Sequence, residues 1–165
     1  MLSTKGRKMN ILHPPFVHFV VALPVIALFS QLTYFITKDK AYSKAAFRIV
    51  GFSLLASFLA VISGIDDAQK IIENQYIVQE GINLLNNHKI FGFVVVATLI
   101  ATSIVKWFAI TKDSSFYENV SLVLIIGLLI VSLYQGRSGG TLVYQYSAGV
   151  DNNVITKRAD EMKKE

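Results

Sequence analysis

The chain contains no cysteine and few charged residues. Among its 165 residues, Asp, Glu, Lys and Arg together make up only 16%. The absence of cysteine excludes disulfides, thiolate metal sites, thiol nucleophiles and covalently attached c-type haem. The low charge argues against a soluble domain, because soluble domains of this length carry more charge on their surfaces.

Several catalytic patterns are also missing. The sequence has no G-x-S-x-G, no H-E-x-x-H and no phosphate-binding P-loop, so it gives little support to hydrolytic or nucleotide-dependent chemistry. The net charge is +5, but the basic residues lie at the ends of apolar runs and in the C-terminal tail. That placement is typical of membrane flanks, and we expect no nucleic-acid partner.

What the chain does have is four long apolar runs, at residues 15–37, 46–65, 89–110 and 119–136. Each is close to the ~20 residues that a helix needs to cross a bilayer. We therefore predict an all-α fold, an integral membrane four-helix bundle, with one domain over residues 11–150 and a polar, frayed tail over 151–165. No internal repeat is evident. No charge lies deep in spans 2 to 4, which argues against ion transport.

The segment between spans 2 and 3 mixes apolar and polar side chains. Over residues 69–87, isoleucine, leucine, valine and tyrosine alternate irregularly with charged and amide residues. Such a pattern is typical of an amphipathic helix that lies on a membrane surface. We predict that structure here.

The chain has three histidines, His13, His18 and His88, and the predicted topology puts all of them at one membrane face. Imidazole is a common protein ligand for haem iron, copper and zinc. His13 and His18 are five residues apart, so one helix would point them in different directions. The preferred axial pair for a b-type haem is therefore His18 and His88, from spans 1 and 3, with His13 in reserve.

Two further residues are consistent with a haem site, and each also has a simpler structural explanation. Gly92 lies one helical turn after His88 and would leave room for a macrocycle, or would simply let two helices pack closely. Arg137 would pair with the haem propionates, or would be an ordinary basic span flank.

Two other functions remain open. The three histidines together with Asp66 or Asp67 would form a nitrogen and oxygen set that suits zinc or copper. Alternatively, the protein is a non-catalytic accessory subunit of a membrane redox complex, and the histidines only cap helices. In every case an electron carrier or accessory subunit is favoured over a stand-alone enzyme.

Several short motifs resemble those of the bacterial membrane-protein family named for its domain of unknown function 2231. They are His13-Pro14, Val17-His18-Phe19, Ser63-Gly64, Asp66, His88, Gly139-Gly140, Leu142-Val143-Tyr144 and Gly149-Val150. The resemblance implies a four-span domain without an assigned activity. In some relatives a similar domain is joined to Rieske-type or c-type cytochrome domains, which implies redox-complex subunits or such cytochromes as partners.

The orientation follows from the basic residues near the spans. The two turns opposite the histidines are short and lysine-rich, with Lys38, Lys40, Lys44, Lys106 and Lys112. Because cytoplasmic loops carry the excess of positive charge, we expect a bacterial inner-membrane protein with its termini and histidines on the periplasmic side.

Overall fold

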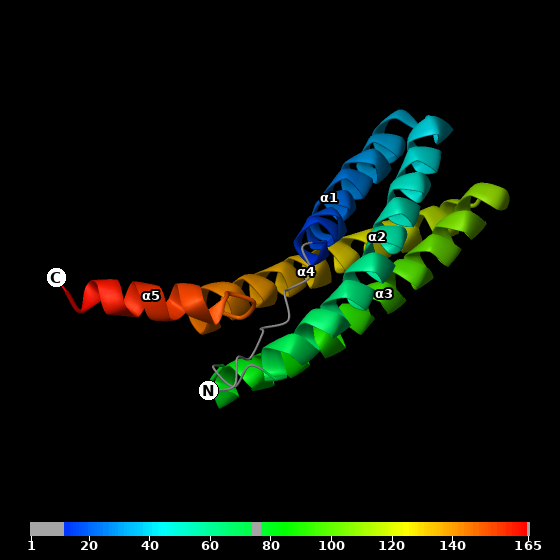
Figure 1. The fold of residues 1–165 in the computed structure, drawn as a ribbon. Helices are drawn as coiled ribbons and strands as arrows, with labels where there is room; N and C mark the ends of the chain where they lie inside the picture. Colours follow the sequence, from blue (N-terminus) through cyan, green and yellow to red (C-terminus); the bar gives the residue numbers. More distant parts are fainter. Residues whose placement is uncertain (1–11, 74–76, 165) are drawn as a thin grey trace.

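The computed structural model describes residues 12–73 and 77–164, and it is entirely helical over that part of the chain (Figure 1). Residues 11 and 165, at the predicted domain and tail ends, and 74–76, within the predicted amphipathic segment, lie outside the described residues. The helices are α1 (His13–Thr37), α2 (Lys40–Glu73), α3 (Gln79–Thr111), α4 (Ser115–Tyr146) and α5 (Asn152–Met162). The first four are long and apolar enough to cross a membrane, which confirms the predicted four-span bundle.

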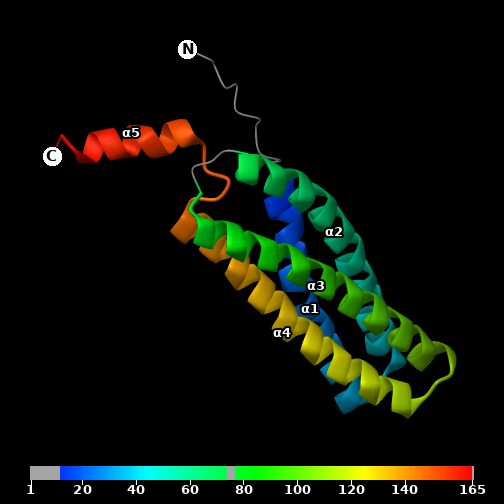
Figure 2. The ribbon, with the colours of Figure 1, turned by 90° about the horizontal axis from the view of Figure 1, so that it is seen from below.

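The four long helices form a ring in which each packs against two neighbours (Figure 2). The neighbouring pairs are α1 with α2, α2 with α3, α3 with α4, and α4 with α1. Consequently α1 and α3 lie diagonally across the bundle axis, as do α2 and α4. Both α1 and α3 begin at the end of the bundle that carries the histidines.

The exterior of the ring is more apolar than its interior. Phe29, Phe52, Ile62 and Val123 are each exposed by about two thirds (65–68%). The interior is lined instead by small and polar residues, including a set of fully or almost fully buried serines: Ser43, Ser53, Ser57, Ser121 and Ser132. This distribution is expected when the solvent is lipid, because small residues let membrane helices approach closely while large apolar side chains face the acyl chains.

The structure corrects the prediction of a separate surface helix between spans 2 and 3. Within the described residues, this segment is divided between the C-terminal end of α2 and the N-terminal part of α3, both continuous with their spans. Part of its apolar surface faces the protein, because Leu85 is buried in one cluster with Ala68, Leu142 and Ala148. Ile72 and Val78 of the same segment are exposed. The longer helices thus extend the bundle at the histidine end, where they bury part of the apolar surface that was assigned to lipid.

The polar tail also differs from expectation, because residues 152–162 form α5. Asp151 caps this helix, its carboxylate accepting a hydrogen bond from the Asn153 backbone N–H at 2.8 Å. Figure 1 shows α5 standing away from the bundle, and over the described residues it packs against none of the four long helices.

The two halves of the bundle, α1–α2 and α3–α4, repeat each other at an offset of 75 residues (88 − 13 and 138 − 63). Every buried residue of α1 has a buried counterpart in α3, and every buried residue of α4 has one in α2. The pairs are Val20/Val95, Pro24/Leu99, Ala27/Thr102, Gln31/Lys106, Ser43/Glu118, Ala46/Ser121, Val50/Ile125, Ser53/Leu128, Ser57/Ser132, Ala60/Gln135, Ser63/Ser138 and Asp67/Leu142.

The turns that close the two halves match as well. Lys38 and Asp113, at the same offset, both adopt the left-handed backbone conformation, with φ of 59° and 47°. Because the equivalent helices run in the same direction, the halves are related by an approximate twofold axis along the bundle. No repeat is evident in the sequence because the halves share a burial pattern rather than many identical residues.

Candidate functional site

His13 lies at the start of α1 with its ring against α2. Its Nδ1 is 2.9 Å from the carbonyl oxygen of Ala60 and 3.1 Å from Ser63 Oγ. A carbonyl oxygen can only accept, so Nδ1 carries the proton and donates it to Ala60. The other ring nitrogen, Nε2, is therefore left with a free lone pair.

The His88 ring, on α3, is held against α4 in the equivalent way. Its Nδ1 is 2.7 Å from Ser138 Oγ, and that hydroxyl donates its own proton to the Gln135 carbonyl at 2.9 Å. Ser138 must then accept from His88, so Nδ1 is again the protonated nitrogen. Both histidines therefore present a lone pair on Nε2.

A glycine beneath each ring makes these positions possible. A Cβ added at Gly64 would lie 2.7 Å from His13 Cε1, and one added at Gly139 would lie 3.2 Å from His88 Cε1. The Ser-Gly pairs, Ser63-Gly64 of α2 and Ser138-Gly139 of α4, therefore form two equivalent positions, which we call the histidine seats. An imidazole ring covers each of them.

The structure does not bring His18 into this arrangement. The His18 side chain is exposed, and its Nδ1 is hydrogen-bonded to the Pro14 carbonyl one turn earlier at 2.6 Å. Prolines occupy the first turn of α1, as predicted. The histidine that this helix turns toward the bundle, however, is His13.

The other predicted site residues are distributed around His88 or away from it. Gly92 faces Gln135, whose Nε2 would be 3.5 Å from an added Cβ, so the room that it leaves holds an amide. Arg137 is exposed on α4. Asp66 is exposed and pairs with Lys70 at 2.6 Å. Among the described residues, no group of three or more His, Asp or Glu side chains is placed to hold a metal ion.

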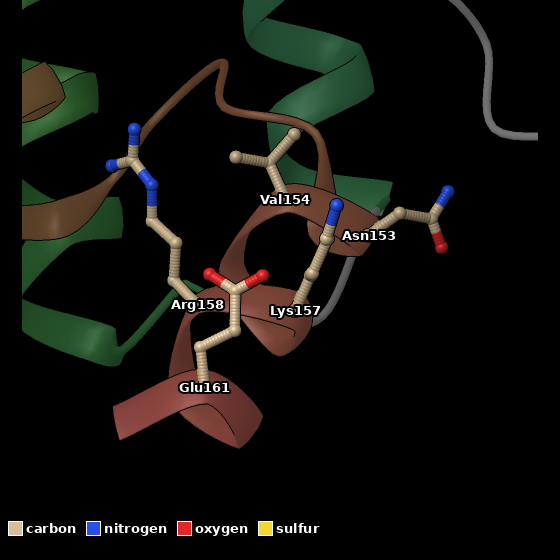
Figure 3. Close-up of a pocket in the computed structure, with 5 residues that line it drawn as sticks. All are labelled: Asn153, Val154, Lys157, Arg158 and Glu161. Atoms are coloured by element: carbon tan, nitrogen blue, oxygen red, sulfur yellow. The ribbon is translucent and has the colours of Figure 1, made fainter. Parts of the chain in front are cut away.

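A pocket on α5 includes none of the histidines among its lining residues. As Figure 3 shows, it is lined by one face of α5, with Asn153, Val154, Lys157, Arg158 and Glu161. All of these side chains come from one solvent-exposed helix, so the pocket is a shallow surface feature.

A second polar cluster, which we call the ion-pair cluster, lies at the opposite end of the bundle. Glu118 accepts hydrogen bonds from Gln31 Nε2 at 2.7 Å, from Ser43 Oγ at 2.6 Å and from Lys106 Nζ. Lys106 also donates to Ser43 at 2.8 Å and lies over the Tyr34 ring, 5.6 Å from its centroid. Each of the four membrane-spanning helices contributes one of these four hydrogen-bonding residues.

The ion-pair cluster corrects one expectation. Lys106 is completely buried and Glu118 is 4% exposed, so Lys106 is not a solvated flank. From Ser43 to Ser63, α2 rises about 30 Å at roughly 1.5 Å per residue, which is about the thickness of the hydrocarbon core. The histidines and the ion pair thus lie near opposite ends of the bundle.

The seat of His13 gives a testable contrast between glycines. Gly64→Ala is expected to lower the free energy of unfolding by about 1–3 kcal/mol, because the new methyl group overlaps the His13 ring. Gly51→Ala, in the same helix, meets nothing within 4 Å and is expected to be neutral or stabilising by up to ~1 kcal/mol. SDS titration of both variants in detergent micelles measures the difference. Equal stabilities would show that the ring adjusts freely.

The fold and the two ends of the bundle define a class: a four-span membrane protein built from a repeated two-helix unit, with one histidine of each half held at the same end of the bundle. The chain matches the family described as "Predicted membrane protein (DUF2231)" over residues 10–152, and it belongs to that family. Comparison with curated proteins and with solved structures gave no match.

Proposed function

We propose that this protein is a membrane electron carrier that holds a b-type haem between His13 and His88. The observation that supports the proposal is the matching tautomer of the two rings: each Nδ1 donates a hydrogen bond, so the lone pair of each ring is on Nε2, and in His88 that lone pair accepts a contact from Gln135 Nε2 at 3.2 Å. Metal-bound histidines usually have this arrangement, because the Nδ1 hydrogen bond fixes the tautomer and orients the ring.

The position of the rings also suits a planar cofactor. His13 and His88 come from α1 and α3, the diagonal helices, so a group bound between them would lie across the bundle axis. The helices on either side, α2 and α4, contribute the small Ser-Gly pairs at that level, and α4 also contributes the Gln135 amide. A bound haem would supply a one-electron couple, and the protein would orient it and shield it from water.

This pairing differs from the one that the sequence alone favoured, since His13 takes the place of His18. Arg137 remains the candidate partner for the propionates, because it is exposed at the same level of α4 as Ser138. The zinc or copper alternative receives less support, because Asp66 is paired with Lys70.

The site lies near one face, so electrons would be exchanged with a partner on that side. We place the protein in a bacterial inner membrane with the histidines toward the periplasm, where a c-type cytochrome or a Rieske-type protein would be its partner. The lysines that remain exposed at the opposite turns, Lys38, Lys40, Lys44 and Lys112, support this orientation.

The test is the visible absorption spectrum of the full chain, purified in detergent from a host that makes haem. We expect a Soret band and, on reduction, the sharp bands of a b-type cytochrome. A well-folded but colourless protein would overturn the proposal and favour an accessory subunit. Stoichiometric zinc or copper without a Soret band would favour the metal site.

A further inference from the structure

One residue breaks the symmetry of the two histidine seats. The seats share histidine, serine and glycine at equivalent positions, but Ala60 in the first half corresponds to Gln135 in the second. Alanine has no polar side-chain atom to offer to His13. Gln135 places an amide directly beside His88, so the two rings are chemically different.

The Gln135 amide contacts the nitrogen that a metal would need. Its Nε2 donates to the His88 carbonyl at 2.9 Å and lies 3.2 Å from His88 Nε2. Because His88 Nδ1 already carries the ring proton, His88 Nε2 must be the acceptor of this second contact. Among the described residues no equivalent donor reaches His13 Nε2.

The oxygen atom of the same side-chain amide is in a less favourable environment than the nitrogen. Gln135 is 9% exposed, and its Oε1 is buried without a hydrogen-bond partner among the described residues. A buried amide oxygen without a partner is unfavourable. The Gln135 Nε2 atom lies over Gly92, where an added Cβ would be 3.5 Å away, so the glycine is what leaves room for this amide beside His88.

From these contacts we infer that Gln135 makes His88 an exchangeable ligand, and that the vacated position binds a neutral diatomic molecule such as carbon monoxide, nitric oxide or oxygen. The inference rests on the proposed haem site. His13 then provides the permanent bond, while His88 has two competing partners for one lone pair, the metal and the Gln135 N–H.

A diatomic ligand would take the position that His88 Nε2 leaves, and the released His88 lone pair would again accept the Gln135 N–H. The amide next to the open position is also a hydrogen-bond donor to a polar ligand, which is how distal groups in haem pockets favour ligand binding.

Carbon monoxide titration of the reduced full-length protein tests the inference. We expect the native protein to bind it, and Gln135→Ala, which copies the alanine of the other seat, to bind it about tenfold more weakly. This corresponds to the ~1.4 kcal/mol of one hydrogen bond. Gln135→Met keeps the volume but lacks the donor, so it should show the same loss and controls for a cavity.

The outcomes separate the two proposals. A native protein without a Soret band overturns both. A protein with a Soret band that does not bind carbon monoxide, or that binds it equally well with alanine or methionine at position 135, overturns the role of Gln135 and leaves the haem site intact.

A second measurement does not depend on the cofactor. In haem-free protein labelled with nitrogen-15 at histidine, Gln135→Ala should shift the Nε2 resonance of His88 and leave that of His13 unchanged. Unchanged signals at both rings would show that the amide does not contact His88 in solution, and the inference would fail.

Discussion

Glu118→Leu is expected to lower the free energy of unfolding by about 3–5 kcal/mol, the usual cost of removing one partner from a buried ion pair. The carboxylate of Glu118 accepts hydrogen bonds from Lys106, Ser43 and Gln31. Without it, the fully buried ammonium group of Lys106 keeps only the Ser43 hydroxyl and the Tyr34 ring as partners. SDS titration in detergent micelles, followed by circular dichroism, measures the loss.

The double variant Lys106→Met, Glu118→Leu is the matched control. Replacing both charges with apolar side chains of similar size leaves no charge stranded, so most of the lost stability should return. If the single and double variants are equally unstable, the hydrogen bonds to Ser43 and Gln31 hold the helices together, and the charges do not. If the single variant is as stable as the native protein, the ion pair contributes nothing.

His13→Ala and His88→Ala are each expected to abolish the b-type absorption spectrum, whereas His18→Ala should retain it. The first two substitutions remove one of the paired Nε2 lone pairs. The third removes an exposed ring that is hydrogen-bonded to the Pro14 carbonyl within its own helix. Haem content per protein, from the reduced-minus-oxidised spectrum, is the measurement.

Because the three variants share one residue type and one membrane face, they control for one another. Unfolding curves in the haem-free state should show that each variant is still folded. Retention of the spectrum in His13→Ala together with its loss in His18→Ala would restore the pairing that the sequence alone favoured, and would contradict the arrangement in the structure.

Hydrophobic run length was sufficient to predict the spans, because an apolar run of about 20 residues matches one bilayer-spanning helix, which satisfies its own backbone hydrogen bonds. The face that each helix turns inward was harder to predict. His13 and His18 are both at the start of α1, and their five-residue spacing says only that they point apart. The choice between them depends on Ser63 and Gly64, which provide the seat for one ring. That contact joins residues 50 positions apart and leaves no local signal.

The ion-pair cluster was missed for a related reason. Lys106 and Glu118 are near the ends of their spans, where charges are common and usually reach water. Comparing the two halves would have revealed them, since Gln31 and Ser43 occupy the equivalent positions and are polar as well. The repeat itself was hidden because it lies in the sizes and burial of side chains rather than in their identities.

A repeat of this kind is what gene duplication and fusion of a two-span ancestor produces. Such an ancestor would have assembled as a parallel homodimer, and each subunit would have supplied one imidazole to a site on its axis. The fused chain has since diverged at one end of that axis, where a glutamine and a serine face a lysine and a glutamate. At the other end both copies still have histidine, serine and glycine. A ligand bound there would lie at the interface between the two halves of the chain. Any movement that separates the two halves would therefore also open the ligand site.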